Sequence, residues 1–368
     1  MQPQRRFSFD WVLIILTLLL LGLGLLMVRS ATGTTAALPF WDTPVVRQGV
    51  WAAVGLAVLA VASLINYRVW AVWRWPLYGG MLILLALVLL LARANFGARS
   101  WLELQALNVQ PAELCKIVLI IVLARYLADH EMAVKRGSGL LVSLCLTAPF
   151  LGLVFAEPDM GTSVILAAIW LGMLFVAGLR PWQIAALAVA AVVLAPLIWN
   201  IMQPHMRERI IMFLYPSAND PKQYNIIQAL IAVGSGGMWG KGLGQGTQTQ
   251  LFFLRVRHTD FIFAVLAEEL GFVGALLLLV LFAALLLRIL RVSARAADAY
   301  GRLVAAGVAI MIFVQIAINI GFHVGLLPVT GLPLPLISYG GSSLLTTLLG
   351  LGLVQSVAMY HQPYEVSQ

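Results

Sequence analysis

The sequence predicts an all-α polytopic membrane protein with ten transmembrane helices. Hydrophobic residues make up 61% of the 368 residues and charged residues only 10%, whereas a soluble domain carries about 25% charge. The apolar stretches have the length of membrane-spanning helices and not of the strands of a membrane barrel. A water-soluble enzyme and a disordered chain are therefore both excluded.

The first apolar stretch, 11–28, follows Arg5 and Arg6 and is longer than the apolar core of a signal peptide, so we expect it to be retained as the first helix. The later stretches have similar lengths, and together they predict one integral membrane domain over 1–368. The ten predicted spans lie near 11–28, 48–66, 74–92, 111–128, 138–155, 161–178, 183–201, 261–287, 303–322 and 340–360.

The basic residues between the spans predict that both termini are cytoplasmic. In this orientation the cytoplasmic segments hold 12 Lys and Arg residues and the short outer loops hold 4, as the positive-inside rule requires. The large loop between helices 7 and 8, 202–260, is then extracytoplasmic. The net charge of +8 is therefore a topology signal and not a sign of nucleic-acid binding, and Cys115 and Cys145 suit neither a disulfide framework nor a zinc site.

Unusual polar residues gather on the outer side in this topology, which places the chemistry at one membrane interface and not along a path through the bilayer. Five groups share this position, at 93–101, 110–116 and 157–162, in the large loop 202–260 that ends at His258-Thr259-Asp260, and at 327–342.

In the second group, Pro111 suits the first position of the fourth helix, which puts Lys116 roughly 7–8 Å below the outer surface. Glu113 and Lys116 share a helix face. They form either an internal salt bridge that fixes helix packing or an anion site lined by Lys116, and the pair alone favours neither. In the third group, Asp159 is expected to be the N-terminal cap of helix six.

The large loop contains an apolar stretch, 223–233, that suits a short interfacial helix and not a span. Seven glycines then fall within 234–246. This stretch is either a flexible surface loop or a cradle whose backbone N–H groups bind an anion together with Lys241.

The loop ends at His258, Thr259 and Asp260. We expect Thr259 to cap the next helix and Asp260 to lie in its first turn, where the helix dipole keeps it ionised and a weak base. Asp260 then acts either as charge compensation for the helix or as a general base at the membrane surface.

The stretch 328–342 contains too many prolines and glycines for a helix and is too apolar for an exposed loop. We interpret it as a fixed outer wall of the site. No ATP is expected outside the membrane and no nucleotide motif is present, so an enzyme here needs a substrate that arrives activated. A lipid-linked pyrophosphoryl sugar fits this requirement.

These motifs resemble the SEDS family (shape, elongation, division and sporulation proteins) over essentially the whole chain, and its elongation members most of all. The most specific are Gly-Ser-Gly-Gly-x-x-Gly-Lys-Gly and His-Thr-Asp-Phe-Ile-Phe within 224–274, and Gly-Leu-Leu-Pro-Val-Thr-Gly-Leu-Pro-Leu-Pro within 319–343. The segments 110–116 and 157–162 match two further family motifs. Three positions depart from the family pattern. Glu157 stands where the family more often has Gln, Ala112 stands where Ser is common, and Arg255-Val256-Arg257 replaces the usual Pro-Glu-x before His-Thr-Asp, which puts basic residues beside Asp260.

The resemblance implies a peptidoglycan glycosyltransferase of the bacterial cytoplasmic membrane that polymerises lipid II on the outer side during cell elongation. It also implies a partner, a single-span class B penicillin-binding protein, and contacts with other membrane proteins of the elongation complex. Asp260 would be the catalytic residue. The candidate substrate-binding residues are Glu113, Lys116, Arg99, Asp159, Lys241, His258, Thr259, Ser338 and Tyr339.

The hypothesis for the reaction is a single inverting displacement. Asp260 takes the proton of the acceptor 4-hydroxyl while that oxygen attacks the donor anomeric carbon, and Lys116 and Arg99 stabilise the departing undecaprenyl pyrophosphate. No cofactor is certain, although a divalent cation on the pyrophosphate is left open. The alternatives are a lipid II flippase, which needs polar groups at several depths, and a non-catalytic scaffold of the wall-synthesis complex.

Overall fold

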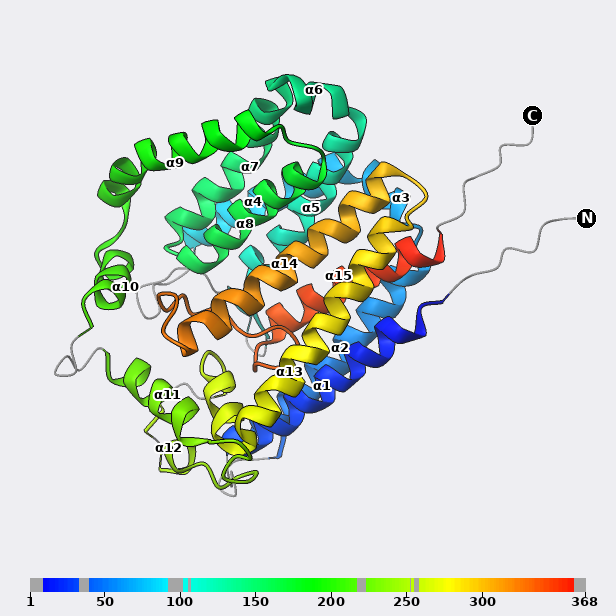
Figure 1. Ribbon diagram of the computed structural model, residues 1–368. Helices are drawn as coiled ribbons and strands as arrows, with labels where there is room; N and C mark the ends of the chain where they lie inside the picture. The colour runs from blue at the N-terminus through cyan, green and yellow to red at the C-terminus, as the bar shows by residue number, and fades with distance from the viewer. Residues whose placement is uncertain are drawn as a thin grey trace, which may run out of the picture.

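A computed structural model of the chain describes residues 9–32, 40–91, 102–104, 107–216, 223–251, 253–254 and 258–360. Within these residues, ten long helices occupy the places predicted for the ten spans (Figure 1). They are α1 (Trp11–Thr32), α2 (Pro44–Leu64), α4 (Arg74–Leu91), α5 (Pro111–Asp129), α7 (Ser138–Ala156), α8 (Met160–Val176), α9 (Pro181–Ile201), α13 (Ile262–Ala294), α14 (Ala299–His323) and α15 (Gly341–Met359).

Seven of these helices are long and apolar enough to cross a membrane by length and composition. The other three differ for simple reasons. Helices α4 and α8 are apolar but shorter, and α5 contains the charged residues Glu113, Lys116, Arg125 and Asp129. The chain is therefore a multi-pass membrane protein.

Short elements connect the spans. Helix α11 (Tyr224–Ser235) confirms the short helix predicted at 223–233. An antiparallel hairpin that the sequence did not predict, β1 (Leu102–Leu104) with β2 (Leu107–Val109), precedes α5, and Glu103 pairs with Asn108 in its register. The remaining elements are η1 (Phe40–Asp42), α3 (Tyr67–Val72), α6 (Glu131–Arg136), α10 (Pro204–Leu214) and α12 (Thr247–Gln250).

The core of the bundle is formed by α5, α14 and α15. Helix α14 packs against α5, α8 and α13, and α15 packs against α2. These central helices are apolar around most of their circumference, and such helices are stable only when surrounded by other protein. Helix α9 is the opposite case, because Gln183 is its one buried residue, and Figure 1 shows α9 and α10 running along the edge of the molecule.

Helix α13 corrects two predictions. It begins at Ile262 with Phe261 as its N-cap and without a side-chain cap, so Thr259 is not the cap and Asp260 lies before the first turn. Gly271, at φ 67° and ψ −165°, then interrupts the helix. A Cβ at Gly271 would lie 2.7 Å from the carbonyl oxygen of Met238, so only glycine allows the loop to approach this closely.

The interruption divides α13 into a short segment, 262–270, and a long segment, 272–294. The short segment is almost wholly buried, whereas the long one exposes large apolar side chains such as Phe272, Leu276 and Leu287. The long segment, which is drawn in yellow beside α1 in Figure 1, is therefore the part suited to face lipid.

The wall segment, 328–340, is non-helical, as predicted. Helix α15 starts at Gly341, so the last two residues of the predicted stretch belong to that helix. Leu332, Leu334 and Ile337 are buried in the protein. Irregular backbone at this level is thus covered by protein, as a membrane requires.

Candidate functional site

The backbone of the His-Thr-Asp motif is held by the wall segment. Tyr339 N donates to the His258 carbonyl at 2.9 Å, and Ser338 Oγ donates to the Thr259 carbonyl at 2.7 Å. The rings of His258 and Tyr339 also meet edge to face, with centroids 5.4 Å apart. Four of the predicted site residues therefore meet here and fix the backbone on which Asp260 stands.

The Asp260 carbonyl is bound from α14. Asn319 Nδ2 donates to this carbonyl at 3.4 Å and to the Leu332 carbonyl of the wall segment at 2.7 Å. Behind Asn319, the buried His323 ring bonds the Asn319 carbonyl through Nδ1 at 2.6 Å, so Nδ1 carries the proton. One amide thus joins the Asp260 backbone to the wall segment.

The Asp260 side chain is half-buried. Loss of hydration raises the pKa of its carboxyl to about 6, although the positive charge of Arg209 and a hydrogen bond with Thr259 both act to lower it. This corrects the expectation of a weak base held ionised by a helix dipole, because Asp260 lies outside the helix and burial dominates. A carboxylate with a pKa near 6 is a stronger base, and it is still ionised at neutral pH.

Arg209, on α10, is a site residue that the sequence reasoning missed. A Cβ added at Gly331 would lie 3.7 Å from both Arg209 Nη1 and Asp260 Oδ2. The guanidinium and the carboxylate therefore approach the same point of the wall segment from different elements. Gly331 itself has φ 73°, a conformation that favours glycine, and its lack of a side chain leaves room between the two charges.

Asp159 forms the predicted N-terminal cap of α8. Its Oδ1 accepts from Thr162 N at 2.9 Å, and its Oδ2 accepts from Thr162 Oγ1 at 2.8 Å and from Gln110 Nε2 at 2.9 Å. The next turn packs directly on the wall segment, because a Cβ at Gly161 would lie 3.1 Å from the Thr330 carbonyl oxygen. The Asp159 turn and Asp260 thus contact neighbouring residues of one segment.

The start of α5 joins the same assembly. Pro111 is the first residue of α5, as predicted, and Gln110 N donates to Ser342 Oγ at 3.0 Å, just beyond the wall segment. Farther along α5, Lys116 Nζ binds Glu113 Oε2 at 2.7 Å, and both side chains are buried. This geometry is the internal salt bridge of the two alternatives, and the use of Lys116 as an anion site stays a prediction.

Glu157, one of the residues that depart from the family pattern, is fully buried between α7 and α8. Burial and the nearby Asp159 raise the pKa of its carboxyl to about 8. At neutral pH most Glu157 side chains are then protonated. A protonated carboxyl is uncharged and can both donate and accept a hydrogen bond, as a Gln side chain can, which explains physically how Glu can occupy this place.

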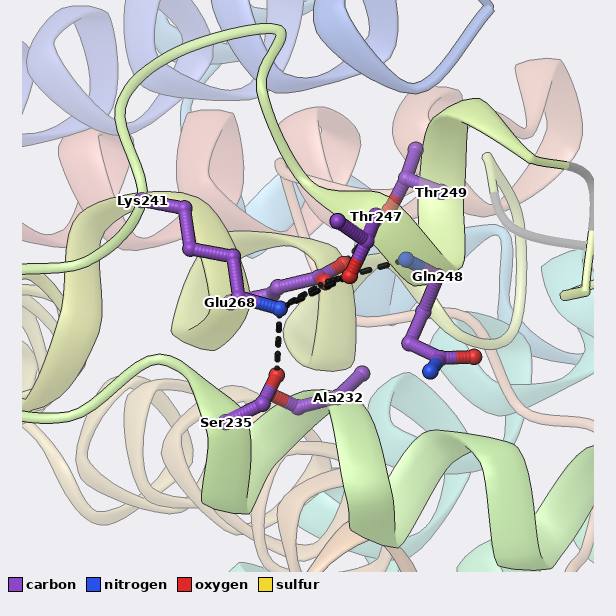
Figure 2. A network of polar contacts seen from close by, with 7 residues as sticks. All are labelled: Ala232, Ser235, Lys241, Thr247, Gln248, Thr249 and Glu268. Atoms are coloured by element: carbon purple, nitrogen blue, oxygen red, sulfur yellow. Dashed lines mark hydrogen bonds and ion pairs between the residues drawn. The ribbon is translucent and has the colours of Figure 1, made fainter.

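Lys241 lies in a different cluster, shown in Figure 2. Its Nζ binds Glu268 Oε1, Ser235 Oγ and Thr247 Oγ1, each at 2.8 Å. Glu268 also accepts from Gln248 N at 3.0 Å and is fully buried. The Lys241 charge is thus paired with a carboxylate of α13, and its predicted contact with substrate stays untested.

This cluster attaches the glycine-rich loop to the short segment of α13. Lys241 N and Gly242 N donate to the carbonyls of Glu268 and Glu269, both at 3.0 Å. Glu269 accepts from Ser30 Oγ of α1, which in turn accepts from Gly244 N. The loop is therefore bonded to its neighbours and is not a free surface loop.

Arg99, the remaining predicted site residue, lies outside the described residues, as do Arg255 and Arg257. His258, Thr259, Ser338 and Tyr339 thus meet at the wall segment, and the turn that carries Asp159 packs on it. Glu113 and Lys116 lie on α5, whose start is bonded to Ser342 just beyond this segment.

The chain matches known proteins over nearly its full length. Residues 10–363 match the family model FtsW/RodA/SpoVE, described as cell cycle protein. The peptidoglycan glycosyltransferase MrdB of Escherichia coli K12 is 40% identical over 365 residues, which cover 96% of each chain.

Two solved structures share the fold. The structure of the rod shape determining protein RodA of Thermus thermophilus superposes with a TM-score of 0.72 at 33% identity, over 97% of this chain and 99% of that one. A second, described as the structural coordination of polymerization and crosslinking by a peptidoglycan synthase complex, gives a TM-score of 0.83 at 34% identity, over 96% and 99%. This chain belongs to the FtsW/RodA/SpoVE family, the SEDS family that its motifs indicated.

Proposed function

We propose that this chain is a peptidoglycan glycosyltransferase that polymerises lipid II into β-1,4 glycan strands during cell elongation. The observation that carries the proposal is Asp260, a half-buried carboxylate with a pKa of about 6 whose backbone is held by the wall segment and α14. The full-length similarity to a peptidoglycan glycosyltransferase supports the same activity.

The reaction requires one base and a positive environment for a leaving group. The acceptor 4-hydroxyl oxygen bonds to the donor anomeric carbon, the bond from that carbon to the pyrophosphate breaks, and the hydroxyl proton passes to Asp260. Arg209 lies beside Asp260 and adds positive charge to the site. Lys116 and Arg99 remain the candidates that stabilise the pyrophosphate. One displacement inverts the anomeric carbon and needs no covalent sugar–enzyme intermediate.

The proposed site faces outward. The Asn319 bond places Asp260 near the C-terminal end of α14. The opposite end of the bundle carries most of the basic residues of the short loops between the spans, including Arg288, Arg291 and Arg295. Positive residues favour the cytoplasmic side, which supports an extracytoplasmic position for Asp260 in the bacterial cytoplasmic membrane.

The proposed partner is a class B penicillin-binding protein, with other membrane proteins of the elongation complex around it. The similarity to a peptidoglycan synthase complex that coordinates polymerization and crosslinking supports this. A divalent cation on the pyrophosphate stays a proposal. Within the described residues no three His, Cys, Asp or Glu side chains form a metal group, but Mg²⁺ is commonly held by one or two carboxylates together with substrate phosphates.

The test is glycan polymerisation from purified lipid II by the full-length protein with its cognate penicillin-binding protein, whose own active serine is removed. Wild type is compared with Asp260→Asn and with Asp129→Asn, a control whose carboxylate pairs with Arg125 at the other end of the bundle. We expect polymer from wild type and the control and none from a folded Asp260→Asn protein.

Normal polymerisation by Asp260→Asn would refute the catalytic assignment. Absence of polymer from every protein, with transport of lipid II across liposomes, would instead indicate the flippase. Restoration of cell elongation by Asp260→Asn in a strain that lacks this protein would indicate the scaffold.

A further inference from the structure

A cavity of about 260 Å³ lies at the end of the bundle opposite Asp260, where the start of α1 meets the ends of α13 and α15. It is separate from every residue of the proposed site. Its lining residues are Phe9, Asp10, Arg288, Arg291, Val292, Arg295 and Ala358.

The cavity carries three arginines from one helix face. Arg288, Arg291 and Arg295 follow one another at spacings of three and four residues, so their side chains lie along the same face of α13. Their positive charges repel one another, and Asp10 is the one acidic residue of the lining. The lining therefore has a formal charge of +2.

Asp10 orients one of these arginines. Its two carboxylate oxygens lie 2.9 and 2.7 Å from Arg288 Nε, and Oδ1 also accepts from Leu13 N at 3.1 Å. These bonds use the Nε side of the guanidinium. Arg291 and Arg295 are exposed, and among the described residues their guanidinium groups have no acidic partner.

The cavity lies at the level of lipid headgroups. The long segment of α13, 272–294, spans roughly 34 Å at 1.5 Å per residue, against about 30 Å for a hydrocarbon core. Its last turns therefore reach the membrane–water interface. Around the cavity, Trp11 is 67% exposed and Leu287 56% exposed, which suits an aromatic interface residue and an acyl-chain contact.

We propose that this cavity binds the phosphodiester headgroup of an anionic glycerophospholipid. Arginine presents a planar fork of donors that matches phosphate oxygens, and basic pockets between membrane helices are typical headgroup sites. A lipid fits better than free phosphate, because Phe9, Val292 and Ala358 add apolar surface to the lining and α13 exposes Leu287 and Leu290 near it. The bound anion relieves the repulsion among the arginines.

The test measures lipid binding to the full-length protein in detergent by native mass spectrometry. Phosphatidylglycerol, phosphatidylcholine and glycerol 3-phosphate are titrated separately. The variant Arg291→Gln/Arg295→Gln is compared with Arg136→Gln/Arg302→Gln, which removes two exposed arginines from the same end of the bundle but outside the cavity.

We expect wild type and the control to prefer phosphatidylglycerol to phosphatidylcholine, and the cavity variant to bind phosphatidylglycerol on the order of tenfold more weakly. Equal affinity of the wild-type protein for the two lipids would overturn the proposal. This result uses no variant, so it does not depend on whether the variants fold. Equal loss in the cavity variant and the control would also overturn it, because net charge would then explain the binding. Binding of glycerol 3-phosphate as tight as that of phosphatidylglycerol would show that the cavity recognises a soluble phosphate, and would overturn the lipid as its ligand.

Discussion

The pKa of Asp260 makes the pH dependence of the reaction a sharp test of the site. A general base acts in its ionised form, so activity is complete above its pKa and falls as the pH drops through it. With a pKa of about 6, kcat/KM should reach half of its plateau near pH 6 and about one-tenth near pH 5. The ratio kcat/KM is the right quantity, because it reports the free enzyme.

Replacing Arg209 by glutamine should move this acidic limb upward. The Arg209 charge favours ionised Asp260, so its removal raises the pKa. Arg209 Nη1 and Asp260 Oδ2 are at most 7.4 Å apart, since both lie 3.7 Å from one point beside Gly331. At an effective dielectric constant of 20, this separation gives about 2 kcal/mol.

Both groups are half-buried, and water screens part of this energy. We therefore expect the midpoint to rise by roughly one pH unit, since 1.36 kcal/mol corresponds to one unit. At pH 6 the Arg209→Gln protein should then keep about one-tenth of its own plateau, where wild type keeps about half. The midpoint is informative even when the plateau falls through weaker substrate binding.

Arg207→Gln is the matched control, because Arg207 lies on the same helix and its Nη2 binds the Asn200 carbonyl at 2.6 Å. The assay is lipid II polymerisation between pH 4.5 and 8.5 at constant ionic strength. An identical midpoint in wild type and both variants would refute the assigned interaction between Arg209 and Asp260. A wild-type rate that stays constant down to pH 4.5 would refute the raised pKa itself.

Two further predictions concern the surroundings of Asp260. Lys241→Met should destabilise the protein by on the order of 2–3 kcal/mol, because it leaves the buried Glu268 carboxylate without its cation. The double variant Lys241→Met/Glu268→Gln should recover part of this loss. Equal melting temperatures for wild type, the single variant and the double variant would contradict the prediction. Glu157→Gln should change activity at pH 7 by less than about twofold. Because folding raises the pKa of Glu157 to about 8, wild type should lose stability relative to Glu157→Gln as the pH rises from about 4.5 to 8, whereas a pH-independent difference in melting temperature would show that Glu157 does not titrate there.

The membrane explains why so much of the fold was predictable. Each span must satisfy its backbone N–H and C=O groups within its own helix, and the thickness of the bilayer nearly fixes the length of that helix. The apolar stretches alone therefore located all ten helices. Local capping chemistry was also predictable, because Pro111 and Asp159 act through residues within one turn. The break at Gly271 was not, since the hydropathy pattern continues across it and the cause is the close approach of the loop at Met238.

The electrostatic partners were the least predictable part of the site. Arg209 precedes Asp260 by some fifty residues, and Lys241 precedes Glu268 by 27, so neither pairing has a local signal. For Arg209 the one available clue was its place in a short polar helix directly after an apolar span. In one of the two alternatives for the glycine-rich stretch Lys241 was expected to bind an anion, whereas its partner in the structure is the Glu268 carboxylate.

The contacts around Asp260 fix it from both sides along the chain. Before the residue, the carbonyls of His258 and Thr259 are bound by the wall segment. After it, the short segment of α13 carries Glu268 and Glu269 in its last turn, and these residues are bonded to the glycine-rich loop and to α1. A base held between two such attachments needs little reorganisation when charge develops on the reacting atoms. The glycine-rich loop can therefore serve the reaction without touching substrate, by keeping the segment that carries Asp260 in place.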